Sequence, residues 1–293
     1  MFRENVLADK KILVTGGGSG LGREMALAFV ALGADVHICG RRGPALEETV
    51  SRVNEDWSGS MTTHISDIRN PESIDAMIDN IWQDGPLTGL LNNAAANFVA
   101  PTKELSARAF DAVTSTVMNG TFYCTNSIGK RWIDEGLPGS IVSTLVTWVW
   151  TGSPYVVPST MAKTAVHAMT MSLAVEWAKY GIRVNAVAPG PFPTEEAWEK
   201  LNPMGDSTGA ASDKYVPQRR YGETPELANL LTFLFADGCD YLTGATIPID
   251  GGHHLAAPST FADMLDLEDK DWAAMRERIQ ATSEKQKGDR SVG

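Results

Sequence analysis

Short apolar runs alternate with longer amphipathic stretches along most of the chain. Seven runs predict strands, and they are apolar nearly throughout, as expected of strands buried on both faces of a sheet. The stretches between them have helical spacing. The predicted strands are Lys11–Thr15, Asp35–Cys39, Thr62–Ile65, Leu87–Leu91, Ser140–Thr144, Arg183–Ala188 and Ala245–Ile249. The predicted helices are Arg23–Leu32, Pro44–Asn54, Pro71–Trp82, Ala107–Glu135, Ala162–Tyr180 and Pro225–Ala236.

This alternation predicts an α/β fold, a Rossmann-type doubly wound parallel sheet of about seven strands. Two regions depart from it. The segment Pro189–Tyr221 is rich in Pro, Gly and polar residues and long for a connection, which is typical of a substrate loop. After Gly252 the chain has left the sheet. We expect one domain over residues 1–256 and a C-terminal extension over 257–293, with one helix at Lys270–Ser283 and frayed last residues, Lys285–Gly293.

Composition and charge narrow the class of protein. The chain has 36 carboxylates against 25 lysines and arginines, a net charge of −11, which argues against a nucleic-acid partner. The cysteines Cys39, Cys124 and Cys239 are too far apart for a disulfide framework, and the scattered histidines predict no metal site. With no leader and no apolar run of about 18 residues, we expect a cytoplasmic protein without a membrane partner.

A glycine-rich loop joins the first predicted strand to the first helix. Residues Thr15 to Gly22 read Thr-Gly-Gly-Gly-Ser-Gly-Leu-Gly. Side chains at three of the glycines would block the turn, the phosphate or the packing of helix on strand, and the helix start offers N–H groups to a pyrophosphate. The strand before and the helix after favour a dinucleotide site over a plain flexible turn. Its candidate residues are Gly16, Gly18, Ser19, Gly20, Leu21 and Gly22.

Two arginines, Arg41 and Arg42, follow the second strand. Sites that prefer NAD usually have a carboxylate here, which binds the ribose 2′-hydroxyl. Arginines instead pair with a 2′-phosphate, so the sequence predicts NADP(H) as the cofactor. The alternative is a solvated surface pair.

Further candidate contacts follow the third and fourth strands. Asp67 is placed to bind the adenine amino group, with Ile68 against the ring. Asn93, Ala94 and Ala95 follow the fourth strand, at the edge of the sheet where ligands bind, and the small side chains allow a ribose to approach.

Taken in order, these motifs resemble the short-chain dehydrogenase/reductase family over residues 10–252. The resemblance rests on the glycine loop, Asp67, Asn93-Ala-Ala, Asn119, Lys163, Asn185-Ala-Val-Ala-Pro-Gly190 and Asp250-Gly-Gly252. Within the family, the 2,4-dienoyl-CoA reductases are most similar, through Asn93–Phe98, Pro101-Thr102, Val156–Ser159 and the tail residues Phe261, Asp266 and Trp272. The resemblance implies a homotetramer and further cofactor contacts from Pro189, Gly190, Pro191 and Phe192.

The resemblance also exposes a departure in the catalytic residues. The family's lysine is present as Lys163, which implies binding of the nicotinamide ribose, and Asn119 matches a helical asparagine that holds a water. The usual tyrosine, four residues before the lysine, is Ser159, and the usual serine, seventeen before, is Val146. An aliphatic hydroxyl is a far weaker acid than a phenol of pKa about 10, so ordinary ketone reduction is disfavoured.

Reduction of a conjugated thioester makes other demands. Its dienolate needs hydrogen-bond donors at the thioester oxygen, while water can protonate carbon. The resemblance implies that Asn97 contacts this oxygen and that Ser159 lies in the site. The dienoyl reductases have a catalytic tyrosine fifteen residues before the lysine, where this chain has Trp148. Tyr155 is the other candidate donor. The alternative for Trp148 and Tyr155 is packing.

Substrate contacts are implied as well. Arg69 and Lys200 match basic positions at the CoA end, although each can equally be a surface cation, and Phe98 and Ser106 are candidates for the acyl pocket. We therefore predict an NADPH-dependent reductase of a 2,4-dienoyl-CoA, in fatty acid metabolism. The alternatives are reduction of a 3-oxoacyl thioester or another ketone with Tyr155 as acid, and an NADP(H)-binding protein without catalysis.

Overall fold

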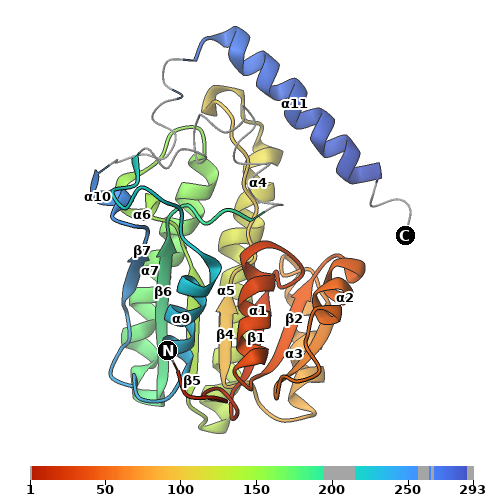
Figure 1. Ribbon diagram of the computed structural model, residues 1–293, viewed down its shortest axis with the longest axis vertical. Helices are drawn as coiled ribbons and strands as arrows, with labels where there is room; N and C mark the ends of the chain where they lie inside the picture. The colour runs from red at the N-terminus through yellow and green to blue at the C-terminus, as the bar shows by residue number, and fades with distance from the viewer. Residues whose placement is uncertain (1, 195–214, 257–263, 265–266, 289–293) are drawn as a thin grey trace.

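A parallel sheet of seven strands runs through the molecule in the order β3-β2-β1-β4-β5-β6-β7 (Figure 1). The computed structural model describes residues 2–194, 215–256, 264 and 267–288. The strands are β1 (Lys11–Thr15), β2 (Asp35–Gly40), β3 (Ser60–Ile65), β4 (Gly89–Asn92), β5 (Gly139–Thr144), β6 (Ile182–Pro189) and β7 (Thr246–Ile249). All neighbouring pairs are parallel, so the predicted Rossmann-type sheet is confirmed.

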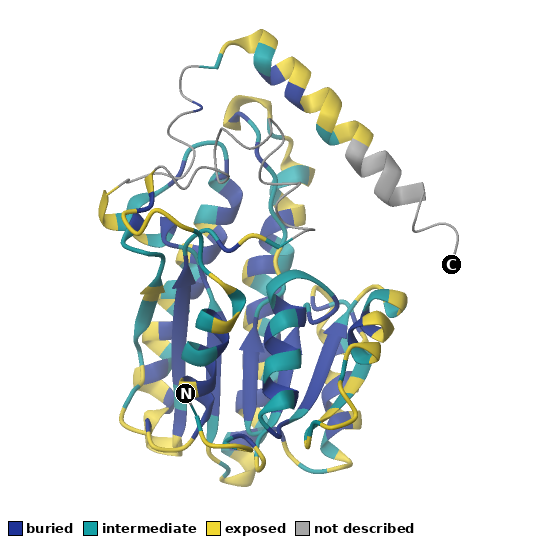
Figure 2. Cartoon of the chain, in the orientation of Figure 1, coloured by how far each residue is buried: buried dark blue, intermediate teal, exposed yellow. Residues whose placement is uncertain are grey.

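Alternate residues of the strands face two separate apolar cores. Ile12 and Val14 of β1 belong to one core, and Leu13 belongs to the other. The helices α1 (Gly20–Ala31) and α9 (Thr224–Phe235) pack on the first face, and α3 (Pro71–Trp82), α5 (Thr121–Glu135) and α7 (Val157–Trp177) on the second. The inner strands are therefore buried on both sides, as Figure 2 shows.

The remaining elements are short or lie outside the sheet. Among them α2 (Gly43–Ser51) begins with Pro44 in its first turn, where a missing N–H costs nothing. The others are η1 (Thr102–Glu104), α4 (Ala107–Thr114), η2 (Ser115–Gly120), α6 (Trp148–Thr151), η3 (Ala178–Tyr180), α10 (His253–Ala256) and α11 (Asp269–Gly288).

Three predicted helices differ from the structure by one to three residues at their ends, and three others differ more. The stretch Ala107–Glu135 is not one regular helix, because α4 and α5 are separated by the π-helical η2. The helix predicted from Ala162 begins at Val157, since Pro158 lies in the first turn and is tolerated there. The tail helix α11 begins at Asp269 and continues through Gly288, five residues beyond the predicted end at Ser283.

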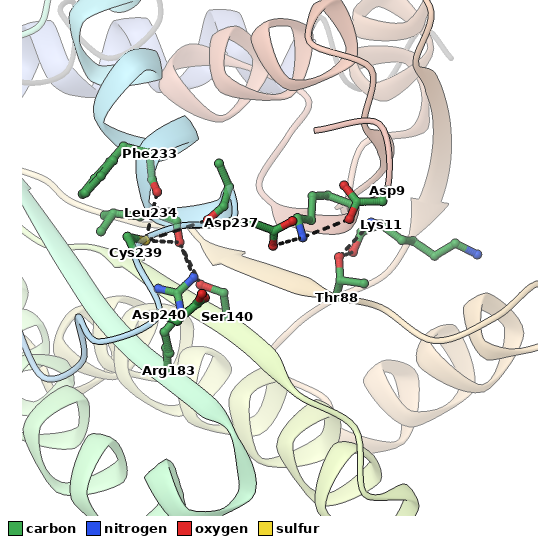
Figure 3. A network of polar contacts seen from close by, with 12 residues as sticks. Asp9, Lys11, Thr88, Ser140, Arg183, Phe233, Leu234, Asp237, Cys239 and Asp240 are labelled. Atoms are coloured by element: carbon green, nitrogen blue, oxygen red, sulfur yellow. Dashed lines mark hydrogen bonds and ion pairs between the residues drawn. The ribbon is translucent and has the colours of Figure 1, made fainter. Parts of the chain in front are cut away.

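The amino ends of the strands are closed by polar contacts, shown in Figure 3. Lys10 Nζ lies 2.6 Å from Asp237, and the backbone N–H of Lys11 donates to the hydroxyl of Thr88 at 2.9 Å. Close by, at the end of α9, Arg183 donates to the carbonyl of Leu234 at 2.9 Å. These contacts join strand ends to the loops around them.

The carboxyl ends of the strands carry the loops with the candidate site. The direction of winding reverses between β1 and β4, which lie side by side, and this is where ligands bind in such sheets. In Figure 1, α11 lies beyond this edge. No helix within the described ranges is long and apolar enough to span a bilayer.

Candidate active site

The glycine loop after β1 packs tightly against the segment after β4. The Thr15 hydroxyl accepts hydrogen bonds from the backbone N–H groups of Asn93 and Ala94, each at 3.0 Å. A Cβ atom at Gly16 would lie 2.9 Å from Cα of Ala94, and one at Gly22 would collide with the carbonyl oxygen of Gly16. Both positions therefore require glycine, and their close packing brings the ends of β1 and β4 together.

The start of α1 leaves room for an anion. Ser19 is the N-cap residue, but its side chain makes no capping hydrogen bond. Gly20 has a φ of 55°, and the one described atom that a Cβ there would meet within 4 Å is Oγ1 of Thr194, at 3.4 Å. The first N–H groups of α1, from Gly20 and Leu21 onward, have no partner within the helix. This open helix start fits a pyrophosphate.

Thr194 is a candidate site residue that the sequence analysis missed. It follows β6 in the chain, and its hydroxyl is buried with no hydrogen-bond partner among the described residues. A buried hydroxyl facing the start of α1 fits a bound phosphate or amide group, which would satisfy it. No local sequence signal marks this residue, because its proximity to Gly20 arises only in the fold.

Arg23 is a second missed residue. Its guanidinium is buried and donates to the carbonyl oxygen of Gly18 at 2.9 Å, and it lies 3.5 Å from the carboxylate of Glu48 in α2. It therefore holds the glycine loop against the helix that follows Arg42. From sequence alone, a charged residue in a helix is expected at the surface. Only the burial of Arg23 in the structure shows that it holds the glycine loop.

The arginines after β2 lie beside the same loop. Arg41 and Arg42 are exposed, and Nη2 of Arg42 lies 3.4 Å from Oγ of Ser19. A cation at this distance from the loop, with a second arginine beside it in the chain, fits the 2′-phosphate of NADP(H) better than a bare ribose.

The adenine side combines Asp67, Ile68 and Arg69. The Arg69 guanidinium donates to both carboxylate oxygens of Asp67, at 2.5–3.0 Å, and its hydrogen bonds hold the pKa of Asp67 below its usual value. Ile68 is buried against Gly120, and Ala95 is exposed at the mouth of the site. The predicted adenine contact and the predicted CoA contact are thus paired with each other.

The lysine lies on the long helix α7, behind β5. Lys163 is buried, and among the described residues its Nζ has one hydrogen-bond partner, the carbonyl of Thr144 at the end of β5. Burial lowers its pKa to about 8. Ser159 is buried one turn earlier on the same helix, and Asn119 is half-buried in η2, which packs against α7. The structure therefore brings the helices of Lys163, Ser159 and Asn119 together.

The two candidate donors lie in an apolar cluster with the tail. Trp148 is buried with Val156 and Trp272 in this cluster, against which Val146 also packs. The Tyr155 hydroxyl donates to the carbonyl of Met264 at 3.2 Å, and its ring centroid lies 4.4 Å from that of Trp272. This geometry favours packing for both side chains over proton donation.

The candidate substrate residues are dispersed. The half-buried Asn97 accepts a hydrogen bond from the N–H of Phe98 through its side-chain oxygen, which leaves the amide NH₂ as the donor. Phe98 packs between η2 and Ala162 of α7. Ser106 is exposed and caps α4 by accepting from the N–H of Ala109 at 3.2 Å, so its oxygen has a structural role.

The segment after β6 is held against β7. The N–H of Gly190 donates to the carbonyl of Ile249 at 3.0 Å, after Pro189 ends β6. Pro191 and the buried Phe192 border a cavity of about 300 Å³, and Tyr155, Trp272 and Lys103 are among the residues that line a second cavity of about 390 Å³. Lys200 lies outside the described residues.

The chain is similar in sequence to known reductases. Residues 16–254 match a family model described as enoyl-(acyl carrier protein) reductase. A protein of Caenorhabditis elegans named as a probable 2,4-dienoyl-CoA reductase producing (3E)-enoyl-CoA is 38% identical over 98% of this chain and 94% of its own length. A probable 2,4-dienoyl-CoA reductase of Bacillus subtilis, named as producing (2E)-enoyl-CoA, is 38% identical over 85% of this chain and 98% of its own.

Solved structures show the same fold. A short-chain dehydrogenase of Bacillus anthracis superposes with a TM-score of 0.77 at 40% identity, covering 85% of this chain and 98% of that one. A protein of Agrobacterium tumefaciens assigned as a 2-deoxy-D-gluconate 3-dehydrogenase, with NADP bound, superposes with a TM-score of 0.76 at 30% identity, covering 87% of this chain and all of that one. The chain is an oxidoreductase with a nicotinamide-cofactor fold, and it belongs to the short-chain dehydrogenase/reductase family.

Proposed function

We propose that this enzyme is an NADPH-dependent reductase of conjugated acyl thioesters, with a 2,4-dienoyl-CoA as substrate. The observation that carries the proposal is the residue one turn before Lys163 on α7, which is the aliphatic Ser159 in place of a phenol. Reduction of a ketone requires prompt protonation of an alkoxide, whereas a dienolate is stabilised by conjugation and accepts a proton from water at carbon. The relatives named as dienoyl-CoA reductases support the same substrate.

One set of residues binds the cofactor and another set binds the substrate. Bound NADPH supplies the hydride. The N-terminus of α1 and Thr194 hold the pyrophosphate side, Arg41 and Arg42 pair with the 2′-phosphate, and Lys163 binds the ribose hydroxyls through its ammonium. Asp67 and Ile68 bind the adenine.

On the substrate side, the Asn97 NH₂ donates to the thioester oxygen and stabilises the dienolate charge. Phe98 packs against the acyl chain, and Ser159 and the water held by Asn119 complete the polar side of the pocket. Arg69 and Lys200 contact the CoA end. Trp148, buried in its apolar cluster, forms an apolar wall of the pocket.

The carbon that is protonated decides which product forms. Hydride addition at C5 leaves a dienolate, and protonation at C2 gives a 3-enoyl thioester while protonation at C4 gives a 2-enoyl thioester. We propose the (3E) product, because the relative whose name states that product matches nearly the full chain, tail included, whereas the Bacillus subtilis relative matches 85% of it. Product analysis by NMR separates the two outcomes.

The decisive experiment measures consumption of NADPH by the purified enzyme with three matched substrates. These are 2,4-hexadienoyl-CoA, 2-hexenoyl-CoA and 3-oxohexanoyl-CoA. We expect the dienoyl thioester to give the highest kcat/KM. Fastest turnover of the 3-oxoacyl thioester would instead establish a carbonyl reductase, and the acid would then have to be found.

We also propose that the enzyme is a cytoplasmic homotetramer. The side chains of Phe122 on α5 and of Met161, Met171 and Val175 on α7 are large, apolar and exposed in the single chain, which supports burial between subunits. Sedimentation velocity tests the assembly, and a monomer would contradict it.

A further inference from the structure

Tyr155 joins three segments that are far apart in the sequence. Its backbone carbonyl accepts a hydrogen bond from the N–H of Ala100 at 2.9 Å, in the segment that carries Asn97. Its hydroxyl donates to the carbonyl of Met264, and its ring lies against that of Trp272, both in the C-terminal tail. It stands directly before Val156 and the start of α7.

The backbone of Tyr155 is strained. Its φ of 63° lies in the left-handed region, which a residue with a bulky side chain rarely adopts. Such a conformation persists only where the surrounding contacts determine it, and these residues cluster at functional sites. The contacts to Ala100, Met264 and Trp272 are what hold it here.

The tail is seated on the same region by other contacts. Trp272 and Met275 are buried in the apolar cluster with Val99, Trp148 and Val156. Lys103 Nζ lies 3.0 Å from Asp269, and Arg276 pairs with Glu104. Lys103 and Glu104 belong to η1, which follows Ala100, so the tail contacts the Asn97 segment on both sides of the Tyr155 hydrogen bond.

We propose that Tyr155 is a positioning residue through which Trp272 in the tail fixes the Asn97–Ala100 segment against the start of α7. The inference rests on the proposed function in one respect, the contact of Asn97 with the thioester oxygen. The tail then sets the KM for the thioester. The glycine loop is held separately, by Thr15 and Arg23, so NADPH binding does not depend on the tail.

Hydrogen exchange tests the positioning without any substrate. In Trp272→Ala, we expect the amide of Ala100 to exchange at least about tenfold faster than in the wild type, because its acceptor is no longer held. The matched control is Trp82→Ala, which removes a partly buried tryptophan at the end of α3 whose indole N–H donates to Glu135 of α5. If the amide of Ala100 exchanges equally fast in the two variants, general destabilisation explains the faster exchange and the proposal is overturned.

Kinetics test the consequence for the active site. We expect Trp272→Ala to raise the KM for the thioester about tenfold and to leave the Kd for NADPH within about twofold, and Trp272→Phe to restore most of the loss. Parallel weakening of NADPH binding would contradict the inference. If the wild type reduces no dienoyl thioester, the proposed function fails, while the exchange experiment still decides the positioning role.

Tyr155→Phe separates positioning from acid catalysis. It removes the hydroxyl contact to Met264 and keeps the ring against Trp272. If Tyr155 is a positioning residue, we expect Tyr155→Phe to lower kcat by less than about tenfold and to leave the pH profile unchanged. A loss of about a hundredfold or more would make Tyr155 a general acid and overturn the proposal.

Discussion

The two edges of the sheet use lysine in opposite ways. At the amino edge, burial alone would lower the pKa of Lys10, but the hydrogen bond and charge of Asp237, with Asp9, outweigh it and the pKa is raised. At the carboxyl edge, burial lowers the pKa of Lys163 to about 8, and its one described partner is a backbone carbonyl. Lys10 is charged and paired, whereas Lys163 is charged at neutral pH without a carboxylate.

The difference teaches which edge serves stability and which serves binding. The contacts in Figure 3 join the amino ends of the strands to neighbouring loops. At the carboxyl edge, the hydroxyls of Ser143 and Thr194 are buried without a partner in the described part of the chain, and the backbone of Tyr155 is strained. Buried polar atoms without a described partner also occur elsewhere, as at Nη1 of Arg183, but at the carboxyl edge the hydroxyls of Ser143 and Thr194 fit a ligand that supplies the missing partners.

The largest effect is expected for Lys163→Met. Loss of the ribose contact should lower kcat/KM by about a thousandfold, because the cation orients the hydride donor. The same substitution should raise the free energy of unfolding of the cofactor-free protein at pH 7 by about 1–3 kcal/mol, since it removes a buried unpaired charge. Steady-state kinetics measures the loss in kcat/KM, and urea denaturation measures the free energy of unfolding. If the variant is less stable than the wild type, the contrast between the two edges is wrong.

A smaller effect is expected for the arginines of the carboxyl edge. Substitution of both Arg41 and Arg42 by Ala should weaken NADPH binding by at least about a hundredfold and leave NADH binding nearly unchanged, because each of the two charge-assisted contacts contributes about 1.5–3 kcal/mol. Fluorescence titration with both cofactors measures the ratio. If the affinities for NADH and NADPH fall equally, the two arginines do not bind the 2′-phosphate.

The titration of Lys163 gives a pH dependence with a defined sign. Its pKa falls from 10.5 in the unfolded chain to about 8 in the folded one. Above pH about 8, NADPH must bind a deprotonated site and recapture a proton, so its affinity should fall up to tenfold per pH unit. Stability of the cofactor-free protein should rise between pH about 8 and 10.5, where only the unfolded chain keeps the proton. In Lys163→Met, both trends should disappear.

The smallest effect is expected at the amino edge. Lys10→Met removes the ion pair with Asp237, a carboxylate that is 75% exposed, and should lower the free energy of unfolding by less than about 1 kcal/mol. Turnover should not change. A loss of activity comparable to that of Lys163→Met would show that the two edges are not functionally distinct.

Much of the fold was predictable because it depends on local pattern. β1 has the predicted bounds, Lys11–Thr15, and α3 has the predicted bounds, Pro71–Trp82, since an apolar run and a Pro-started amphipathic stretch each carry their own signal. The break of helix 107–135 at η2 was not predictable, because the π-helical turn has no distinctive composition. The early start of α7 was hidden by Pro158, which as a residue type argues against a helix.

The sequence by itself determined the strand order along the chain, the glycine loop and the missing phenol before Lys163, because each is set by residue type at a fixed spacing. Only the tertiary structure decided that Thr194 faces Gly20 and that Arg23 is buried beside Glu48 of α2. It also decided that Tyr155 contacts the tail. The physical reason is that burial and partner choice depend on segments that meet only after the sheet has formed, so neither can be read from local sequence.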